Sequence, residues 1–87
     1  MARNDMGEWV RWLAGYAPVC QVCNAQRAIE AHHLYFGCYG ADKDDTRLLS
    51  VCRECHMWCH RNKKLSQARF GALAIDNWET YQGSKDE

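Results

Sequence analysis

Two pairs of cysteines have the spacing at which neighbouring thiolates bind one metal ion: Cys20 with Cys23, and Cys52 with Cys55. Four thiolates complete the tetrahedral shell of a structural zinc ion. The polar amino terminus shows no hydrophobic signal segment, so we expect a reducing compartment, where such pairs are more often metal ligands than disulfides. A thioredoxin-like redox pair needs a βαβ context that the sequence lacks. The pattern therefore predicts a structural zinc site, with disulfides as the alternative.

The remaining two of the six cysteines belong to neither pair. Cys38 lies in a segment rich in glycine and aspartate, where we expect an unliganded thiol in a loop. Cys59 lies beside His60, and two interpretations stay open for it: a small buried apolar group, or an alternative metal ligand.

All four histidines lie close to the cysteine pairs in the sequence. His56 and His60 are four residues apart in a predicted helix, so both imidazoles lie on one face and can bind one ion. His32 and His33 are neighbours in a predicted strand and point to opposite faces, so only one can easily join that ion. The other would be free to act as a base near neutral pH. Alternatively, the histidines surround the zinc knuckle, or one replaces a cysteine in a single site.

In chain order, these motifs resemble the zinc-containing HNH endonucleases of the ββα-metal fold. The resemblance covers roughly residues 20–64. It rests on Cys20-x-x-Cys23, on Glu30-Ala31-His32-His33-Leu34, and on an apolar strand leading into Cys52-x-x-Cys55-His56 and on to His60. Colicin-type nuclease domains have a similar histidine doublet and His-x-x-x-His pair. The resemblance implies that His33 is the general base and that the ligands of a catalytic ion are His32, His56 and His60.

The activity implied is that of a metal-dependent DNA endonuclease, in which an ion polarises the phosphate and stabilises the leaving oxygen. Arg53 or Arg61 would hold a non-bridging phosphate oxygen. Glu30 lies on the same strand face as His32 and would orient that ligand, or else is a solvated strand residue. A histidine-rich shell suits zinc, nickel, cobalt or manganese better than magnesium, but it does not identify the ion.

One position departs from the family pattern. The family carries an asparagine shortly before the apolar strand, where it fixes the loop that holds the base. Here Asp45, Thr46 and Arg47 occupy that stretch. The side chain of Asp45 or Thr46 can make comparable loop hydrogen bonds. The alternative function is a non-catalytic zinc-binding module that binds nucleic acid or a protein partner through its basic helix or its tryptophan-bearing first helix.

Positive charge is concentrated in the middle of a chain that is neutral overall, with 11 basic and 11 acidic residues. Between Arg47 and Arg69, Glu54 is the only acid. A neutral chain does not coat nucleic acid by bulk charge, so a polyanion site should lie on this segment. The candidate DNA contacts are Arg53, Arg61, Lys63 and Lys64.

The amino-terminal half is expected to contain a helix and a hairpin. Trp9, Trp12, Leu13 and Tyr16 have helical spacing, which predicts a helix over 8–17 that ends at Pro18. A hairpin over 19–31 would have the cysteine knuckle as its tight turn and would continue through the histidine doublet.

The carboxy-terminal half is expected to be mainly helical. A loop over 37–46 leads to an apolar strand over 48–51. One helix is expected over 53–65 and another over 67–81, with fraying from Gly83 onward.

These elements predict an α+β fold: a small zinc-stabilised ββα-metal, treble-clef-like core over about 19–65, with helical flanks over 5–17 and 67–81. We expect a single domain over 1–87, since the chain is too short for two cores. Its core is marginal without a zinc ion. No apolar run reaches the roughly 18 residues of a membrane span, so we expect a soluble cytoplasmic protein.

The expected partner is DNA, with no membrane contact. The resemblance suggests a phage or mobile-element origin and a bacterial or phage-infected host cell. Because so short a chain has little surface for sequence readout, a nuclease acting alone should be weakly specific. Dependence on a protein partner or a homodimer is the alternative.

Overall fold

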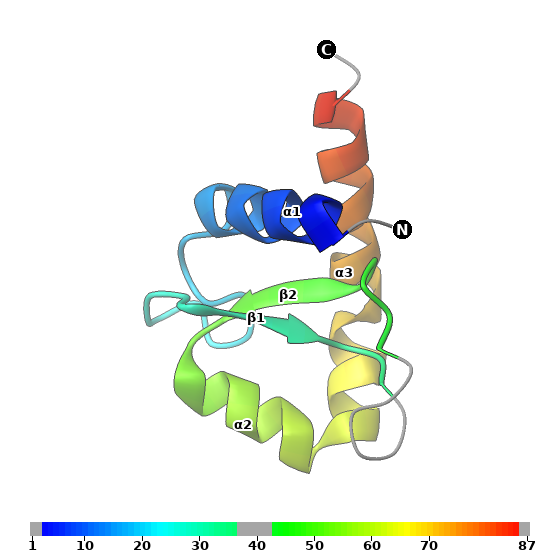
Figure 1. Ribbon diagram of the computed structural model, residues 1–87. Helices are drawn as coiled ribbons and strands as arrows, with labels where there is room; N and C mark the ends of the chain where they lie inside the picture. The colour runs from blue at the N-terminus through cyan, green and yellow to red at the C-terminus, as the bar shows by residue number, and fades with distance from the viewer. Residues whose placement is uncertain (1–2, 37–42, 86–87) are drawn as a thin grey trace.

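The computed structural model describes residues 3–36 and 43–85 and has an α+β architecture, as the sequence predicts. In chain order its elements are α1 (Arg3–Tyr16), β1 (Glu30–His33), β2 (Leu48–Val51), α2 (Arg53–Arg61) and α3 (Lys63–Lys85). Figure 1 shows the sheet between α1 on one side and α2 on the other, with the long α3 running past both. Cys38 and most of the loop expected over 37–46 lie outside the described residues.

Strands β1 and β2 pair antiparallel, and every residue of β2 is buried. The second edge of β2 is closed by side chains: the Ser50 N–H donates to Gln21 Oε1 at 2.9 Å, and Asn77 Nδ2 donates to the Leu48 carbonyl at 2.9 Å. Gln21 and Asn77 also bond to each other. The turn that carries Gln21 and helix α3 are thereby held against the same strand.

The expected hairpin over 19–31 forms only in part. Val19 and Arg27 make an isolated bridge, and Asn24 turns the chain with a φ of 56°, a left-handed conformation that asparagine tolerates. By Ile29 the chain has changed partner, because the Ile29 N–H donates to the Val51 carbonyl at 2.9 Å. The continuous strand therefore begins only at Glu30 and pairs with β2.

Helix α1 ends at Tyr16, two residues before Pro18. It buries Trp9 and Leu13 in a cluster with Leu48 and Tyr81, and the Trp9 ring stacks on Tyr81 with centroids 4.9 Å apart. Tyr16, which shares the helical spacing of these residues, is half exposed. The first helix is therefore fixed to the sheet and to α3 by an aromatic core.

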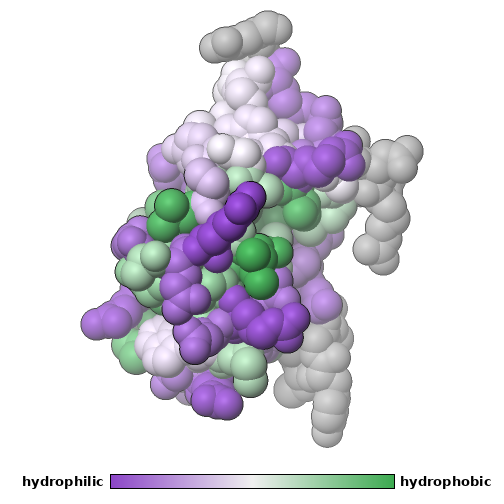
Figure 2. Space-filling model, turned by 90° about the vertical axis from the view of Figure 1, so that its left-hand side faces the viewer, coloured by the Kyte–Doolittle hydropathy of each residue, from purple (hydrophilic) through white to green (hydrophobic). Residues whose placement is uncertain are grey.

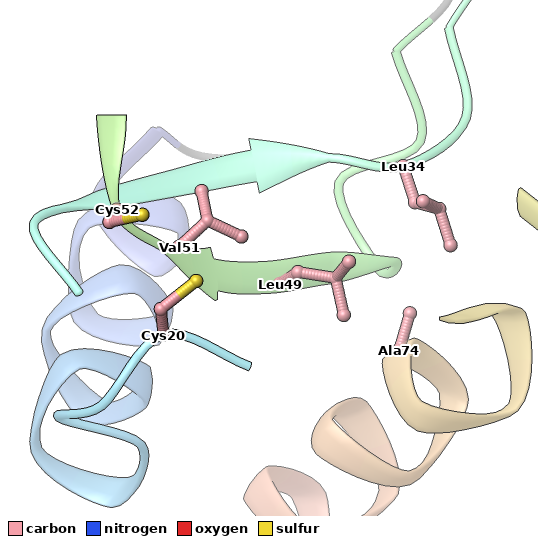
Figure 3. Close-up of a cluster of buried hydrophobic side chains, with 6 residues drawn as sticks. All are labelled: Cys20, Leu34, Leu49, Val51, Cys52 and Ala74. Carbon is pink, nitrogen blue, oxygen red and sulfur yellow. The ribbon is translucent and has the colours of Figure 1, made fainter. Parts of the chain in front are cut away.

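A second cluster of buried apolar residues lies between the sheet and α3. Figure 3 shows Leu34 and Leu49 pointing toward Ala74 of α3, with two cysteine side chains at the other end of the group. Its buried members are Cys20, Leu34, Leu49, Val51, Cys52 and Ala74. The cysteine pairs therefore lie at the end of a hydrophobic core.

The boundary between the last two helices differs from the expected one. Helix α2 ends at Arg61 rather than at 65, because Asn62 leaves the helical conformation and its Nδ2 donates to the Trp58 carbonyl at 3.0 Å. Helix α3 begins at Lys63 rather than at 67. It continues past Gly83, so the fraying expected there is wrong as far as Lys85, whose Nζ lies 5.3 Å from the centre of the Tyr81 ring.

Some large apolar side chains remain exposed, among them Tyr16, Val19 and Ile29. On the face shown in Figure 2, hydrophobic areas are separated by hydrophilic side chains. Scattered exposure of this kind is ordinary in a small protein. None of the helices in the described part of the chain is long and apolar enough to cross a membrane.

Candidate metal centres

The four paired cysteines come together at one point. One ligand atom from each lies within 4.8 Å of the others, close enough for a single ion to be held among them. Two come from the turn after α1 and two from the start of α2: Cys20, Cys23, Cys52 and Cys55. All four are free thiols, so the disulfide alternative finds no support.

The environment of these sulfur atoms favours a shared negative charge. Burial raises the pKa of Cys20, but backbone N–H groups of Cys23, Cys52 and Val22 outweigh it and lower that pKa to about 6. Burial and the neighbouring thiols raise the pKa of Cys55. The Cys20 thiolate is thus stabilised by amides, while Cys55 keeps its proton until a cation replaces it. This donor set fits a structural zinc ion.

The fifth described cysteine takes no part in this group. Cys59 is fully buried, and burial first of all raises its pKa to about 11. A buried thiol of that kind is chemically inert. Of the two interpretations left open by the sequence, the structure supports the small buried apolar group.

Three of the four histidines form a second group. Their ligand atoms also lie within 4.8 Å of one another, with one histidine from β1 and two from successive turns of α2: His32, His56 and His60. Their ring centroids are 4.9 to 5.0 Å apart. The spacing in the helix and the alternation in the strand therefore place three imidazoles around one point, as expected.

The His32 side chain supplies an independent test of whether a cation fits there. It is 1% exposed, and neither of its ring nitrogens has a hydrogen-bond partner among the described residues. Buried polar atoms are normally paired, because leaving one unsatisfied is costly. Burial, followed by the charges of His56 and His60, lowers the pKa of His32 to about 3, so the ring is neutral. A neutral, unpaired imidazole is the form that binds a metal ion.

Glu30 contacts a different histidine from the one expected. Its Oε1 lies 2.8 Å from Nδ1 of His56, not against His32. This hydrogen bond is the main cause that lowers the pKa of Glu30. The expected partner is wrong because α2 packs against β1 and presents the ring of His56 to the carboxylate. With Nδ1 engaged, Nε2 of His56 is left as the ligand atom.

His33 lies apart from the three clustered rings. Its Nε2 is 2.8 Å from Oδ1 of Asp45, in the loop that precedes β2. In the same loop, Asp44 Oδ1 accepts hydrogen bonds from the backbone N–H and the hydroxyl of Thr46, at 2.9 and 2.6 Å. The doublet is thus divided as the strand geometry predicts, with one imidazole in the cluster and the other paired with a carboxylate.

Cations surround the histidine group on several sides. Arg53 is 72% exposed and lies 3.7 Å from Oε2 of Glu30. Lys63 Nζ lies 4.5 Å from the centre of the Phe36 ring, which is 5.1 Å from the ring of His60. Burial, the charge of His56 and then that of Lys43 lower the pKa of His60. These charges favour an anionic ligand at this site.

The four predicted DNA contacts therefore divide into two groups. Arg53 and Lys63 border the histidine group, whereas Arg61 and Lys64 are exposed on α2 and α3 and, among the described residues, make no hydrogen bond, ion pair or ring interaction with it. Lys43 and Phe36 were not predicted. Phe36 follows the doublet closely in sequence, but a lone aromatic residue is no signal. Lys43 lies among aspartates, where charge counting does not single it out.

Comparison of the chain with protein-family models, with curated proteins and with solved structures gave no match. The features of the chain that bear on its function are therefore the geometry of the two groups and the sequence motifs.

Proposed function

We propose that this protein is a metal-dependent DNA endonuclease of the HNH type, with β1, β2 and α2 forming a ββα-metal core. The observation that carries the proposal is the buried, unpaired imidazole of His32, which converges with His56 and His60 while the adjacent His33 stays outside the group. A purely structural padding role would leave no reason for two unsatisfied nitrogens in a buried ring. Three ligands with an open position, together with a separate base, form an arrangement suited to metal-assisted hydrolysis.

The residues of the chain have distinct roles in this reaction. His33 takes a proton from the attacking water. His32, His56 and His60 hold a divalent ion, which when bound supplies positive charge to the scissile phosphate and the leaving oxygen. Glu30 orients His56 through its hydrogen bond.

The substrate class follows from the distribution of charge. The chain carries no net charge, yet Lys43, Arg53 and Lys63 all lie near the histidine group. Glu30 offsets part of the charge of Arg53, but Lys43 and Lys63 add positive charge near the same histidines, and this local field attracts a phosphodiester backbone. Binding of this kind is not sequence-specific, since phosphate contacts carry no base information.

The cysteine group supports the reaction indirectly. Cys52 is the N-terminal cap of α2, and Cys55 lies in the first turn of the helix that carries His56 and His60. A zinc ion held by the four thiolates would therefore fix the start of α2 against the turn after α1. The spacing between the two helical histidines and β1 would then stay constant.

Cleavage of supercoiled plasmid DNA tests this function. Zinc-loaded protein is incubated in turn with zinc, nickel, cobalt, manganese and magnesium, and nicked and linear products are measured on a gel. We expect cleavage with at least one of these ions. A His56→Ala, His60→Ala double variant with intact cysteines is the control and should not cut. Protein with both sites filled that cuts with none of the five ions would instead favour a non-catalytic zinc-binding module.

A further inference from the structure

The contact between His33 and Asp45 determines which nitrogen of the imidazole carries the proton. An ionised carboxylate can only accept a hydrogen bond. Because Oδ1 of Asp45 lies 2.8 Å from Nε2 of His33, the N–H must be on Nε2. In the neutral ring, the lone pair is then on Nδ1. In histidines generally, the hydrogen bond at one ring nitrogen sets the state of the other.

Asp45 has a firmly held backbone although its side chain is 60% exposed. Its carbonyl accepts a hydrogen bond from Nε1 of Trp9 at 2.7 Å. Trp9 is itself buried, stacked on Tyr81 and in edge contact with Trp78, with centroids 5.2 Å apart. Helix α1 therefore anchors the residue that contacts His33.

The residues beside Asp45 are fixed as well. The Asp44 side chain bonds to Thr46, and the Asp44 N–H donates to the Tyr35 carbonyl at 3.0 Å. An ion pair between two loose surface side chains would orient nothing, because its geometry fluctuates and its energy is small. Here hydrogen bonds hold the backbone at Asp44, Asp45 and Thr46, so the carboxylate of Asp45 can hold a ring in place.

We propose that Asp45 is the positioning residue of His33: its carboxylate keeps the proton on Nε2 and directs Nδ1 toward the attacking water. This inference rests on the proposed function. In the step it supports, a water O–H bond breaks and its proton moves to Nδ1. The water oxygen bonds to phosphorus as the bond from phosphorus to the leaving oxygen breaks, and that oxygen takes a proton from solvent. Helix α1 thereby contributes to catalysis through Trp9 without touching the substrate.

The tautomer of His33 can be measured without any cleavage. Long-range nitrogen-15 to proton correlation spectra of the zinc-loaded protein assign the state of each histidine ring. We expect His33 to carry its proton on Nε2, and Asp45→Asn to shift the ring toward the Nδ1–H form, since an amide can donate to Nε2. Asp76→Asn, which removes the same charge from an exposed position on α3, is the matched control and should change nothing. A wild-type His33 with its proton on Nδ1 overturns the inference.

Kinetics on a short DNA duplex separate positioning from binding. In a buried histidine–aspartate pair the same substitution lowers kcat about 10⁴-fold through the wrong tautomer. Because Asp45 is 60% exposed, we expect a smaller loss for Asp45→Asn, about 10²-fold in kcat, with KM and zinc affinity unchanged. Asp45→Glu keeps the carboxylate and should recover part of the rate. Cleavage by Asp45→Asn at the wild-type rate overturns the inference and leaves the nuclease intact.

The role of helix α1 is tested by a pair of matched substitutions. Trp9→Phe removes the N–H that holds the Asp45 carbonyl and keeps an aromatic ring in the core. Trp78→Phe changes the same aromatic cluster without touching Asp45. We expect a several-fold loss of kcat for the first and no loss for the second, and equal losses would overturn the anchoring role of Trp9. If the unmodified protein fails to cut DNA with any of the ions tested, the proposed function fails. The tautomer spectrum still reports on Asp45 independently.

Discussion

The cysteine group and the histidine group each bring their ligand atoms close enough for one ion, but they differ in coordination capacity. Each places its ligand atoms within 4.8 Å of one another. The cysteine group offers four sulfur donors, which close a tetrahedral shell, whereas the histidine group offers three nitrogen donors and leaves a position open. Closed shells are typical of structural sites, and open ones are typical of sites that bind water or substrate.

The surroundings of the cysteine group and the histidine group also fit a structural site and an open site, respectively. Cys20 and Cys52 belong to a hydrophobic core, and backbone N–H groups stabilise the thiolate of Cys20. The histidine group borders Glu30, Arg53 and Lys63, all of which are at least partly exposed. The comparison teaches that one group is suited to holding the fold and the other to meeting an anionic ligand.

The largest expected effect is loss of folding when the closed shell is broken. Cys20→Ser or Cys55→Ser should abolish cooperative unfolding, because a structural zinc ion contributes on the order of 10–16 kcal/mol in small zinc-finger peptides. Circular dichroism and elemental analysis measure the outcome. Cys59→Ala is the control, since this thiol is outside the group, and it should fold with one zinc retained in the cysteine site. Cooperatively folded Cys55→Ser protein without zinc would contradict the assignment.

The next largest effect separates the base from the ligands. His33→Ala should lower the cleavage rate about 10²–10⁴-fold, which is the usual contribution of a general base, and leave metal affinity nearly unchanged. His56→Ala should weaken binding of the ion itself. Calorimetric metal titration alongside plasmid cleavage distinguishes the two variants. If His33→Ala cuts at full rate, His33 is not the base.

A smaller effect is expected for the carboxylate that contacts His56. Glu30→Gln should weaken metal binding at the histidine site by about 10–100-fold, as is typical when a hydrogen-bond partner of a ligating histidine is replaced. Zinc in the cysteine site should be unaffected. Glu54→Gln is the control, because Glu54 lies on α2, the helix that carries His56, but bonds to Gln26. Equal affinities for the Glu30 and Glu54 variants would mean that the hydrogen bond does not orient the ligand.

The smallest effects are expected among the cations. Lys63→Glu should weaken DNA binding and flatten its salt dependence, because each phosphate contact contributes about 0.9 to the slope of log K against log salt. Lys64→Glu makes the same charge change one residue away, on an exposed side chain that makes no hydrogen bond, ion pair or ring interaction with the histidine group among the described residues. It should have the smaller effect. Fluorescence anisotropy at several salt concentrations measures both, and identical slopes would move the DNA site away from the histidine group.

Much of the two ligand groups can be predicted from local spacing. A Cys-x-x-Cys pair brings two thiols together in any tight turn, and residues four apart on a helix share a face. The alternation of a strand likewise divides His32 from His33, one buried and one partly exposed. These relationships depend on backbone geometry over a few residues, so the sequence alone is enough to find them.

The sequence was a poorer guide where side chains choose between competing partners. Asn62 ends α2 because its amide bonds to the Trp58 carbonyl, although nothing in the composition of 53–65 interrupts a helix. Glu30 faces the same way as His32 on the strand but bonds to His56, since α2 lies within reach of its carboxylate. In both cases the hydrogen-bond partner is decided by differences of a few ångströms between candidate groups. The sequence pattern does not show which of these groups is nearer.

By itself the sequence determined which residues can bind metal and which elements carry them, because ligand chemistry and helical or strand periodicity are local properties. Only the tertiary structure decided that Trp9, 36 positions away in the sequence, bonds to the Asp45 carbonyl and that Asp45 contacts His33. It also decided that Lys43 and Phe36 lie beside the clustered histidines. These contacts between distant segments depend on how the aromatic core packs α1 against the sheet and α3. The spacing of residues along the sequence does not specify where that packing places a loop.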